Sequence, residues 1–518
     1  MPNRTILFQS SLWKWVLALA AGLYAFYLPA YFVGYFNDDA LYLVGAKSLL
    51  QGRFVYLYRL HQPPINLILP GFPLILAPFV LTFGSHWAWY KFISVILTMG
   101  VALMTWKLFD GWIAPFPRIG LLALASWNPV AALYSGTVMS EPCYTFAVIG
   151  AFLLYKNLLN QPDRWIWKLS LGLCLAWASL IRPIGVVLLV AVAAGLAYEK
   201  RWRTLEQTFA IALPLWLAVM FRNYRLTHTV TAYFALRPSD LSASSPWVSW
   251  LGSFYKLADA LFANLVLGWW GSGTGSWGHI AHTAIILLGG TLLLRGLIRF
   301  SNNSEIQEGM TLAMACFVFL HLWTHSFWSA FDCRYLLPVL PFVLAGCVAG
   351  LQGSPKKKIV GPVLFSLLIV LYACRHAMAF QEIWIHPSPV RQLPRQTLLW
   401  IQNLPGKEII ETARPATVYL YTAHLAETTP NLENTDLFHY WRLKTGISYI
   451  FYQDEPLLVA QRAVLWQGTM DWVRRHPKHY ELIYQNISES TVVYHVLPDP
   501  VFLRQFESQL LRDRARLE

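Results

Sequence analysis

Apolar segments of about 16 to 23 residues recur along the first three quarters of this chain, separated by short polar stretches. A helix needs about 20 apolar residues to cross the ~30 Å hydrocarbon core of a bilayer, so these segments are candidate membrane spans. Only 13% of the residues are charged, whereas a soluble domain carries about 25%. The sequence therefore excludes a string of soluble domains and predicts a mainly α-helical, multi-spanning membrane protein.

We expect a membrane helix bundle of about 11 spans. The spans are expected near residues 13–33, 86–108, 118–134, 140–157, 166–182, 184–199, 205–221, 278–298, 310–330, 333–351 and 358–379. The stretch 247–270 is read as a helix lying in the outer interface, because Leu257 and Leu265 follow helical spacing opposite Lys256 and Asp259. A twelfth span, which would reverse the remaining topology, is the alternative.

Short basic loops alternate with longer ones and predict the orientation. The basic loops contain Lys107 and Arg118, the stretch 156–168, the stretch 200–203, Arg295 and Arg299, and the stretch 356–358. Since basic loops stay in the cytoplasm, the outer face receives loops 34–85 and 222–277 and the C-terminal tail. We expect a multi-pass protein of the plasma (inner) membrane with a cytoplasmic N-terminus.

The tail changes character at residue 385. We divide the chain into a membrane domain, 1–384, and a small extracytoplasmic α/β domain, 385–518, with a strand at 491–497 and helical patterns at 395–404 and 456–467. The tail holds equal numbers of basic and acidic residues, so the net charge of +13 belongs to the apolar part. That distribution excludes a basic nucleic-acid-binding domain and favours contacts with membrane lipids or phosphate.

Acidic residues near a membrane core are costly to keep there, which makes them candidates for chemistry. Asp38 and Asp39 directly follow the first expected span. Two adjacent carboxylates repel each other, which raises the pKa of one and makes it a better base. The simpler interpretation is a solvated cap on the helix expected over 40–51.

His321 and His325 are four residues apart, with Asp332 nearby, which is a spacing that metal ligands use. The pair lacks the glutamate of a zinc-protease motif and lies beside Trp323 and Trp328 at the outer end of an expected span. Interfacial polar side chains are the favoured interpretation. We expect no metal site and no cofactor.

Several short motifs follow one another in order along the expected outer face. They are DDALYL at 38–43, AKSL at 46–49, PP at 63–64, PGFPL at 70–74, NP at 128–129, SEP at 140–142, RPIG at 182–185, RNYR at 222–225 and RYLLP at 334–338. In the order and spacing of these motifs, residues 1–380 resemble the GT-C membrane glycosyltransferases, which include the protein O-mannosyltransferases and the bacterial aminoarabinose transferases. An outer C-terminal domain is also typical of that family.

The resemblance implies transfer of a sugar from a polyprenyl-phosphate-linked donor to a lipid, glycan or protein acceptor outside the cytoplasm. An acceptor hydroxyl needs a carboxylate to take its proton as it attacks the anomeric carbon. The leaving lipid phosphate is a weak base and needs positive charge, which arginine forks supply without a metal. Direct displacement inverts the anomeric centre.

The roles that the resemblance implies begin with Asp38 as the base and Asp39 as second choice or orienting partner. Glu141 is expected to bind sugar hydroxyls or position the acceptor, with a helix N-terminal acid as the simpler interpretation. Lys47 and Arg334 are candidate phosphate contacts. Further candidates for substrate binding are Arg53, Arg59, Arg182 and His61, for which headgroup anchoring or an ordinary loop position is the alternative.

Two other functions remain open. A flippase or transporter of lipid-linked sugars would place ionisable groups near the membrane midplane and often show repeated halves, whereas here the acids gather at one face. A polysaccharide polymerase would not need the acidic pair at 38–39. The sugar and the acceptor are not specified by the sequence.

Overall fold

The computed structural model describes residues 4–231, 246–267, 276–303, 308–326, 333–352, 360–388, 391–406, 408–428, 435–453 and 470–515. The chain forms two compact units. The helical unit comprises Met1–Ala30 and Asn66–Ile385, and the mixed unit comprises Tyr31–Ile65 and His386–Glu518. The segment Tyr31–Ile65, which follows the first helix of the chain and contains the second, therefore belongs with the C-terminal residues, which the sequence did not suggest.

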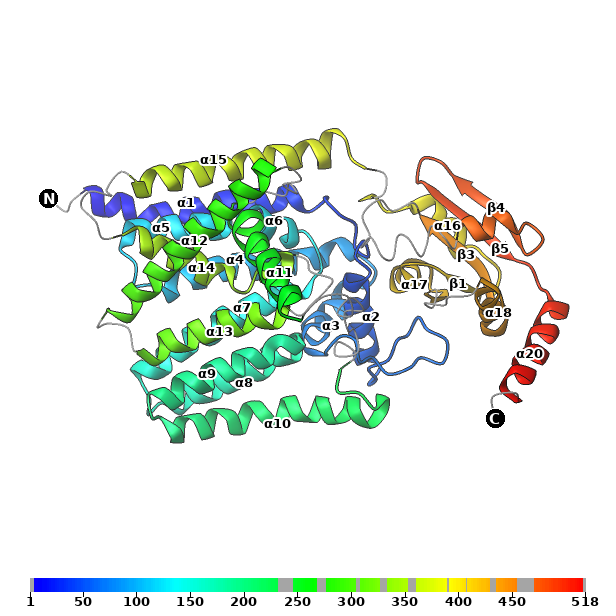
Figure 1. Cartoon of the computed structure of the whole chain (residues 1–518), viewed down its shortest axis with the longest axis horizontal. Helices are drawn as coiled ribbons and strands as arrows, with labels where there is room; N and C mark the ends of the chain where they lie inside the picture. The colour runs from blue at the N-terminus through cyan, green and yellow to red at the C-terminus, as the bar shows by residue number, and fades with distance from the viewer. Residues whose placement is uncertain are drawn as a thin grey trace. The chain divides into compact units, whose positions relative to one another are not determined.

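The helical unit consists of helices and short turns (Figure 1). Its helices are α1 (Arg4–Tyr27), α3 (Gly71–Phe83), α4 (Tyr90–Leu108), α5 (Pro115–Ser126), α6 (Pro129–Ser135), α7 (Ser140–Asn160), α8 (Trp165–Ile181), α9 (Val186–Tyr198), α10 (Trp202–Thr227), α11 (Pro246–Asp259), α12 (Ser276–Ser301), α13 (Glu308–Ser326), α14 (Leu340–Leu351) and α15 (Val360–Phe380). Its 3₁₀ turns are η1 (Trp87–Trp89), η2 (Pro183–Gly185) and η5 (Cys333–Leu336), and its π-helical segments are η4 (Ala260–Val266) and η7 (Gln381–Ile385).

Five helices in the described part of the chain are long and apolar enough to cross a membrane. They are Trp87–Leu108, Ser140–Asn160, Trp202–Thr227, His282–Ser301 and Gly361–Ile385, and four shorter apolar helices are Gly71–Phe83, Trp165–Ile181, Pro183–Tyr198 and Leu340–Leu351. A helical membrane bundle is thus supported, while the count of about 11 spans stays a prediction.

Several expected spans have other bounds in the structure: the span expected at 333–351, for example, is the turn η5 followed by α14. Two differences have a clear cause or consequence. The expected span 118–134 is two helices, because Asn128 caps α6: its Oδ1 accepts hydrogen bonds from the backbone N–H groups of Val130 and Ala131, both at 3.1 Å. Pro129 then occupies the first turn, where its missing N–H costs nothing. The second difference is α3, an apolar helix within the stretch 34–85 that the sequence analysis treated as a loop.

Close helix contacts in this unit depend on small residues. A Cβ added to Gly296 of α12 would collide with the backbone of Gly346 in α14, and one on Gly350 would collide with the backbone of Leu292. Small residues let membrane helices approach until their backbones touch, so α12 and α14 pack without intervening side chains. Elsewhere α1 runs alongside α15, where Tyr27 Oη lies 2.8 Å from His376 Nδ1 (Figure 1).

The amphipathic pattern expected over 247–270 is present at the end of α11, where Leu257 is buried and Lys256 is exposed. It does not continue into the π-helical segment η4, whose buried residues are Ala260, Leu261, Phe262, Ala263, Leu265 and Val266. The position of this stretch relative to a membrane stays a prediction.

The mixed unit is built on a five-stranded sheet of order β2-β1-β3-β5-β4. Its strands are β1 (Ile409–Glu411), β2 (Leu425–Glu427), β3 (Ile447–Gln453), β4 (Tyr480–Asn486) and β5 (Thr491–Val496). Pairs β1–β2 and β1–β3 are parallel, and pairs β3–β5 and β4–β5 are antiparallel. Its helices are α2 (Asp38–Leu50), α16 (Arg395–Gln402), α17 (Pro415–Thr422), α18 (Thr435–Thr445) and α20 (Pro500–Ala515). The expected α/β character, the strand at 491–497 and the helix at 395–404 are confirmed, and the helix expected at 456–467 lies outside the described residues.

Helices pack on both faces of the sheet around β5, whereas most of edge strand β4 is exposed (Figure 1). Residues of α16 and α17 pack with Val493 on one face, while Trp441 and Leu443 of α18 pack with Tyr494 and Val496 on the other. A strand buried on both faces does not need strict alternation of polar and apolar residues. This explains why the pattern of 491–497 alternates imperfectly.

The segment Tyr31–Ile65 is held within the mixed unit by backbone contacts. Thr417 Oγ1 donates a hydrogen bond to Gly34 O at 2.7 Å, and Tyr421 Oη donates to Val33 O at 2.9 Å. Gly34 has φ of 104°, a conformation that favours glycine, and a Cβ there would lie 2.6 Å from Thr417 Cγ2. The loop that leads into the Asp38–Asp39 pair at the start of α2 is therefore held by C-terminal residues.

Candidate functional site

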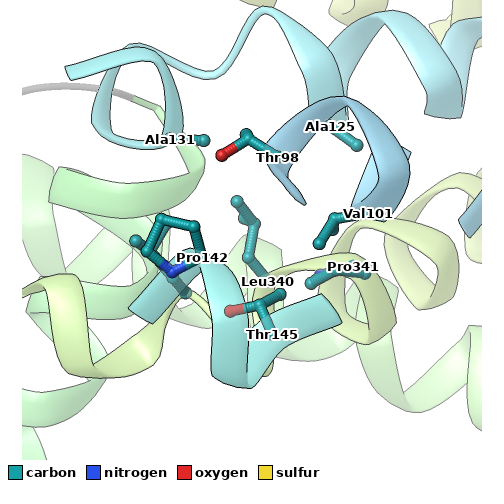
Figure 2. A pocket seen from close by; sticks show the side chains of 9 residues that line it. Thr98, Val101, Ala125, Ala131, Pro142, Thr145, Leu340 and Pro341 are labelled. Carbon is teal, nitrogen blue, oxygen red and sulfur yellow. The ribbon is translucent and has the colours of Figure 1, made fainter. Parts of the chain in front are cut away.

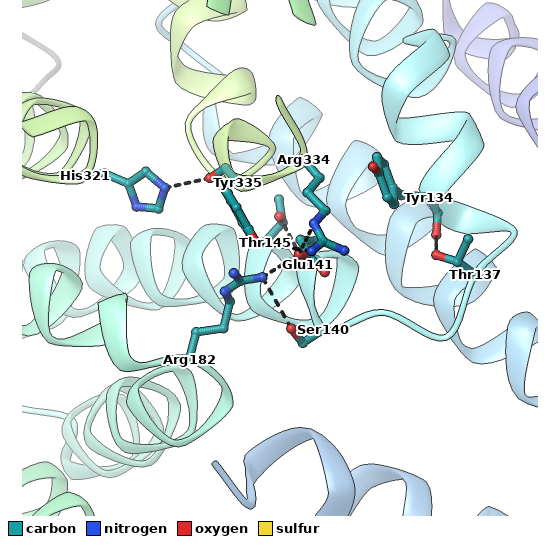
Figure 3. Close-up of polar contacts among 9 residues, drawn as sticks. All are labelled: Tyr134, Thr137, Ser140, Glu141, Thr145, Arg182, His321, Arg334 and Tyr335. Carbon is teal, nitrogen blue, oxygen red and sulfur yellow. Dashed lines mark hydrogen bonds and ion pairs between the residues drawn. The ribbon is translucent and has the colours of Figure 1, made fainter. Parts of the chain in front are cut away.

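A buried cluster of one acid and two arginines lies in the helical unit (Figure 3). Glu141 is in the first turn of α7, Arg182 ends α8, and Arg334 lies in the turn η5. Arg182 Nη1 is 2.6 Å from Glu141 Oε1, and Arg334 Nε is 3.5 Å from the same oxygen. All three residues are candidates predicted from the sequence, and the structure brings them together.

Local sequence explains how each side chain reaches the cluster. Pro183 follows Arg182, and a residue before proline favours an extended conformation, so α8 stops and turns there. Arg182 has φ of −141° and ψ of 141°. Glu141 stands at the N-terminal end of α7, where the helix dipole stabilises a carboxylate. Glu141 and Arg182 thus lie at helix ends, where their side chains can extend beyond the surfaces that pack against neighbouring helices.

Ser140 and Tyr335 complete the cluster, and sequence analysis did not assign either of them. Arg182 Nη1 also donates to Ser140 Oγ at 3.3 Å, and Arg334 Nη2 donates to Tyr335 Oη at 3.1 Å. Both guanidinium carbons lie 5.0 Å from the centre of the Tyr335 ring. The sequence offers one signal for them, which is adjacency to a candidate residue: Ser140 directly precedes Glu141, and Tyr335 directly follows Arg334.

The electrostatics of the cluster favour an anion. Two guanidinium groups share one carboxylate oxygen, and side chains of all three residues are at most 11% exposed. Burying charges is costly unless they are paired, and in the described part of the chain two guanidinium groups are directed at this one carboxylate. Planar arginine forks match the oxygens of a phosphate.

A small, largely apolar pocket lies next along α7 (Figure 2). Pro142 and Thr145 of α7 line it together with residues of α4, α5, α6 and α14: Thr98, Val101, Ala125, Ala131, Leu340 and Pro341; Leu337 completes the lining. Thr145 Oγ1 donates to the backbone carbonyl of Glu141 at 2.8 Å. The polar cluster therefore has an apolar neighbour on the same helix.

Asp38 and Asp39 begin α2 in the mixed unit. Asp39 is 1% exposed, and its Oδ2 accepts a hydrogen bond from the backbone N–H of Gly34 at 2.6 Å. Its Oδ1 has no hydrogen-bond partner among the described residues. Burial raises the pKa of Asp39 to about 6, although the Gly34 N–H and Arg414 oppose the shift. Asp39 is thus not the solvated helix cap of the simpler interpretation, whereas Asp38 is partly exposed.

Arg414 is a neighbour of Asp39 that sequence analysis missed. Its guanidinium carbon lies 4.8 Å from the centre of the Tyr35 ring and 5.4 Å from that of Phe32. The residue is 5% exposed and lies just before Pro415, which starts α17. Because it is far along the chain from Asp39, no local pattern could have linked the two.

The other candidates in the mixed unit differ in their surroundings. Lys47 is partly buried in the last turn of α2, and burial lowers its pKa. Arg59 pairs with Glu427 of β2, Nε to Oε2 3.0 Å, which is a structural contact. Arg53 and His61 are exposed, and Arg53 donates to Gln51 Oε1 at 2.9 Å. Headgroup or ligand contacts of Arg53 and His61 stay predictions.

His321 and His325 face backbone carbonyl groups. His321 Nε2 lies 2.9 Å from Tyr335 O, and His325 Nδ1 lies 2.9 Å from His321 O. Their ring centres lie 4.6 Å apart with the rings tilted, and the His321 ring stacks on Tyr144. His321 contacts the turn that carries Arg334 through the Tyr335 carbonyl, and His325 through the Tyr335 ring, whose centre is 5.7 Å away. Asp332, the third member of the spacing, lies outside the described residues.

No protein-family model matches the chain, and no curated protein sequence matches it. Several solved structures do resemble it. ArnT from Cupriavidus metallidurans in the apo state has 12% identity and a TM-score of 0.57, over 94% of this chain and 99% of that one. The same protein bound to undecaprenyl phosphate has 11% identity and a TM-score of 0.55, over 96% and 100%.

A third match is an archaeal oligosaccharyltransferase, AglB from Archaeoglobus fulgidus, in complex with an inhibitory peptide and a dolichol-phosphate. It has 10% identity and a TM-score of 0.59, over 95% of this chain and 75% of that one. At such identities the likeness concerns the fold. It extends across both units of the chain.

Proposed function

The chain has the fold of the GT-C membrane glycosyltransferases, to which ArnT and AglB belong, and on that basis we propose that it is a glycosyltransferase. The donor is a sugar linked to a polyprenyl phosphate, and the acceptor is a lipid, glycan or protein. The reaction takes place on the extracytoplasmic face of the plasma membrane. Short basic loops that alternate with the long loops support this orientation.

The cluster of Glu141, Arg182 and Arg334 carries the proposal. A polyprenyl-phosphate donor leaves as a phosphate monoester, whose departing oxygen gains negative charge in the transition state. Preorganised cations in a low-dielectric surrounding stabilise such charge far better than water does. Two guanidinium groups that share one buried carboxylate suit this task, and ArnT has itself been solved with undecaprenyl phosphate bound.

Asp38 is the proposed base. The acceptor hydroxyl oxygen attacks the anomeric carbon, the bond from that carbon to the phosphate oxygen breaks, and the hydroxyl proton passes to the Asp38 carboxylate. A single displacement inverts the anomeric configuration. Partial exposure of Asp38 supports this choice over Asp39, because Asp39 is 1% exposed and bonded to Gly34 N–H. Asp39 then shapes the loop that presents Asp38.

Transfer can be measured with purified protein in lipid nanodiscs and radiolabelled polyprenyl-phosphate sugars. Profiling of lipids and glycans from cells lacking the protein identifies the missing sugar and so selects donor and acceptor. We expect Asp38→Asn to abolish transfer while the protein remains folded in the membrane. Asp471→Asn, at a residue 59% exposed in the mixed unit, is the matched control and should retain full activity.

Two outcomes would contradict the proposal. Full transfer by Asp38→Asn would reject the base assignment. Movement of the lipid-linked sugar across vesicle membranes, with no sugar transferred to any acceptor, would instead identify a flippase.

A further inference from the structure

Three segments of the mixed unit bring His439, His479 and Asp499 together. His439 is on α18, His479 directly precedes β4, and Asp499 directly precedes α20. One ligand atom from each of the three residues lies within 4.8 Å of the others. His479 Nδ1 and Asp499 Oδ2 are 3.3 Å apart. None of these residues has a role in the proposed transfer.

His439 is the buried member of the group. It is 1% exposed, and its ring centre lies 4.4 Å from that of His479. Its Nδ1 lies 2.7 Å from Tyr480 Oη, whereas its Nε2 is buried without a hydrogen-bond partner among the described residues. A buried polar atom that lacks a partner carries a desolvation cost that nothing offsets. A ligand at Nε2 would remove that cost.

The other nitrogen of His439 is held by a rigid network. Tyr480 Oη accepts a hydrogen bond from Arg442 Nη1 at 3.0 Å. Arg442 in turn makes a two-bond ion pair with Glu411, Nε to Oε2 2.5 Å and Nη2 to Oε1 3.0 Å, and both side chains are fully buried. Histidine ligands of metals commonly have the second ring nitrogen fixed in this way, which orients the ring.

We propose that His439, through Nε2, His479 and Asp499 bind a zinc ion that fastens the C-terminal helix α20 to α18. Two imidazoles and one carboxylate suit zinc, whereas magnesium and calcium prefer sites made of oxygen ligands. Tetrahedral zinc with bonds of about 2.0 Å places ligand atoms about 3.3 Å apart. The His479–Asp499 pair has that separation already.

The surroundings give the ion a structural task. Asp499 Oδ1 accepts from Phe502 N at 2.9 Å and so caps α20, while its Oδ2 is directed at His479. The rest of α20 contacts α18 through Phe506, whose ring centre lies 5.1 Å from that of Tyr440, and through an exposed pair of Lys444 with Glu507. A metal would add a fixed link at the N-terminal end of α20, beside these contacts. His479 and Asp499 side chains are each 27% exposed, which leaves room for water as fourth ligand.

The test uses the full-length protein with its affinity tag removed. Protein stripped with a chelator is titrated with ZnCl₂ alone, and bound zinc is counted by mass spectrometry. We expect wild type to bind one more zinc than the double variant His479→Gln/Asp499→Asn. Asparagine keeps the oxygen that caps α20, so loss of metal is separated from loss of the cap. Each single variant should weaken zinc binding at least about tenfold.

His495→Gln is the matched control, because His495 is a partly exposed histidine of β5 whose ring packs on Tyr449. It should bind zinc as wild type does. Equal zinc content in wild type and the double variant would overturn the proposal, as would tenfold weakening by His495→Gln.

Limited trypsin digestion gives a second readout that needs no variant. Arg504 and Arg512 lie on α20, so zinc should slow cleavage at both sites in wild type. Cleavage at the same rate with and without zinc would reject the fastening role, and equal protection by MgCl₂ would reject zinc as the ion.

Discussion

Glu141 lies in the first turn of α7 and Arg182 directly follows the last residue of α8, yet Arg182 Nη1 lies 2.6 Å from Glu141 Oε1. Both side chains are almost inaccessible to solvent. A buried pair like this one is costly to break because the remaining charge keeps its desolvation penalty. Arg334 also approaches the same oxygen at 3.5 Å. The pair therefore affects the stability of the helical unit, and it also belongs to the proposed phosphate site.

Replacement of Arg182 tests the pair. Arg182→Met should lower the free energy of unfolding by about 3–5 kcal/mol, because Glu141 loses its shorter contact. Thermal unfolding in detergent measures the change. Arg474→Met is the matched control, since Arg474 forms an exposed pair with Asp471 at 3.7 Å, and it should cost less than about 1 kcal/mol. Equal effects of the two substitutions would contradict the burial argument.

Asp39 predicts a specific pH dependence of stability. Its pKa rises from 3.8 in the unfolded chain to about 6 in the folded protein, so the folded state holds the proton more tightly. Ionising Asp39 therefore lowers the free energy of unfolding. This loss is absent below about pH 4, grows between pH 4 and 6, and stays constant above about pH 6. The full difference is about 3 kcal/mol.

Asp39→Asn removes this cost and keeps an oxygen to accept the Gly34 N–H. We expect the variant to be more stable than wild type at pH 7 by up to about 3 kcal/mol, and equally stable at pH 4. Unfolding of both proteins across this range measures the difference between them. A difference that does not change with pH would show that Asp39 is ionised at no cost.

The contact between α12 and α14 predicts the effect of one methyl group. Gly296→Ala should push the two helices apart and destabilise the helical unit by about 1–3 kcal/mol, because the added Cβ meets the backbone of Gly346. Gly290→Ala on the same helix is the control, since its Cβ would have nothing within 4 Å. Unfolding temperatures in detergent distinguish the two, and an unchanged value for Gly296→Ala would contradict the backbone contact.

The Glu411–Arg442 pair predicts a non-additive result. Either Glu411→Leu or Arg442→Met alone leaves a fully buried charge and should cost about 3–5 kcal/mol. The double variant removes both charges and should be more stable than either single variant. Chemical unfolding followed by tryptophan fluorescence measures all three. A double variant whose loss equals the sum of the single losses would show that the two side chains act independently.

The membrane bundle, the α/β tail and the residues of the arginine cluster could be predicted because their signals are local. Apolar length indicates candidate spans, a run of β-branched and aromatic residues indicates β5, and short motifs mark Glu141, Arg182 and Arg334. The break at Asn128 was missed because the apolar run continues through it, although an asparagine before a proline is a helix-start signal.

Long-range contacts could not be predicted in the same way. Arg414 affects Asp39 from the other end of the chain, and His439, His479 and Asp499 share no spacing that a motif would reveal. Such groupings depend on how the sheet and its helices pack, which periodicity does not encode. The same reason hid the membership of Tyr31–Ile65 in the mixed unit.

That membership has a consequence for synthesis of the protein. Gly34 leaves the ribosome 383 residues before its partner Thr417, an interval of about 20–80 s at ordinary rates of translation. Throughout that time the loop carrying Asp38 has no sheet to fold against. The proposed base therefore gains its supporting contacts only when the final quarter of the chain has been made, and we expect a product that ends before Thr417 to lack transfer activity.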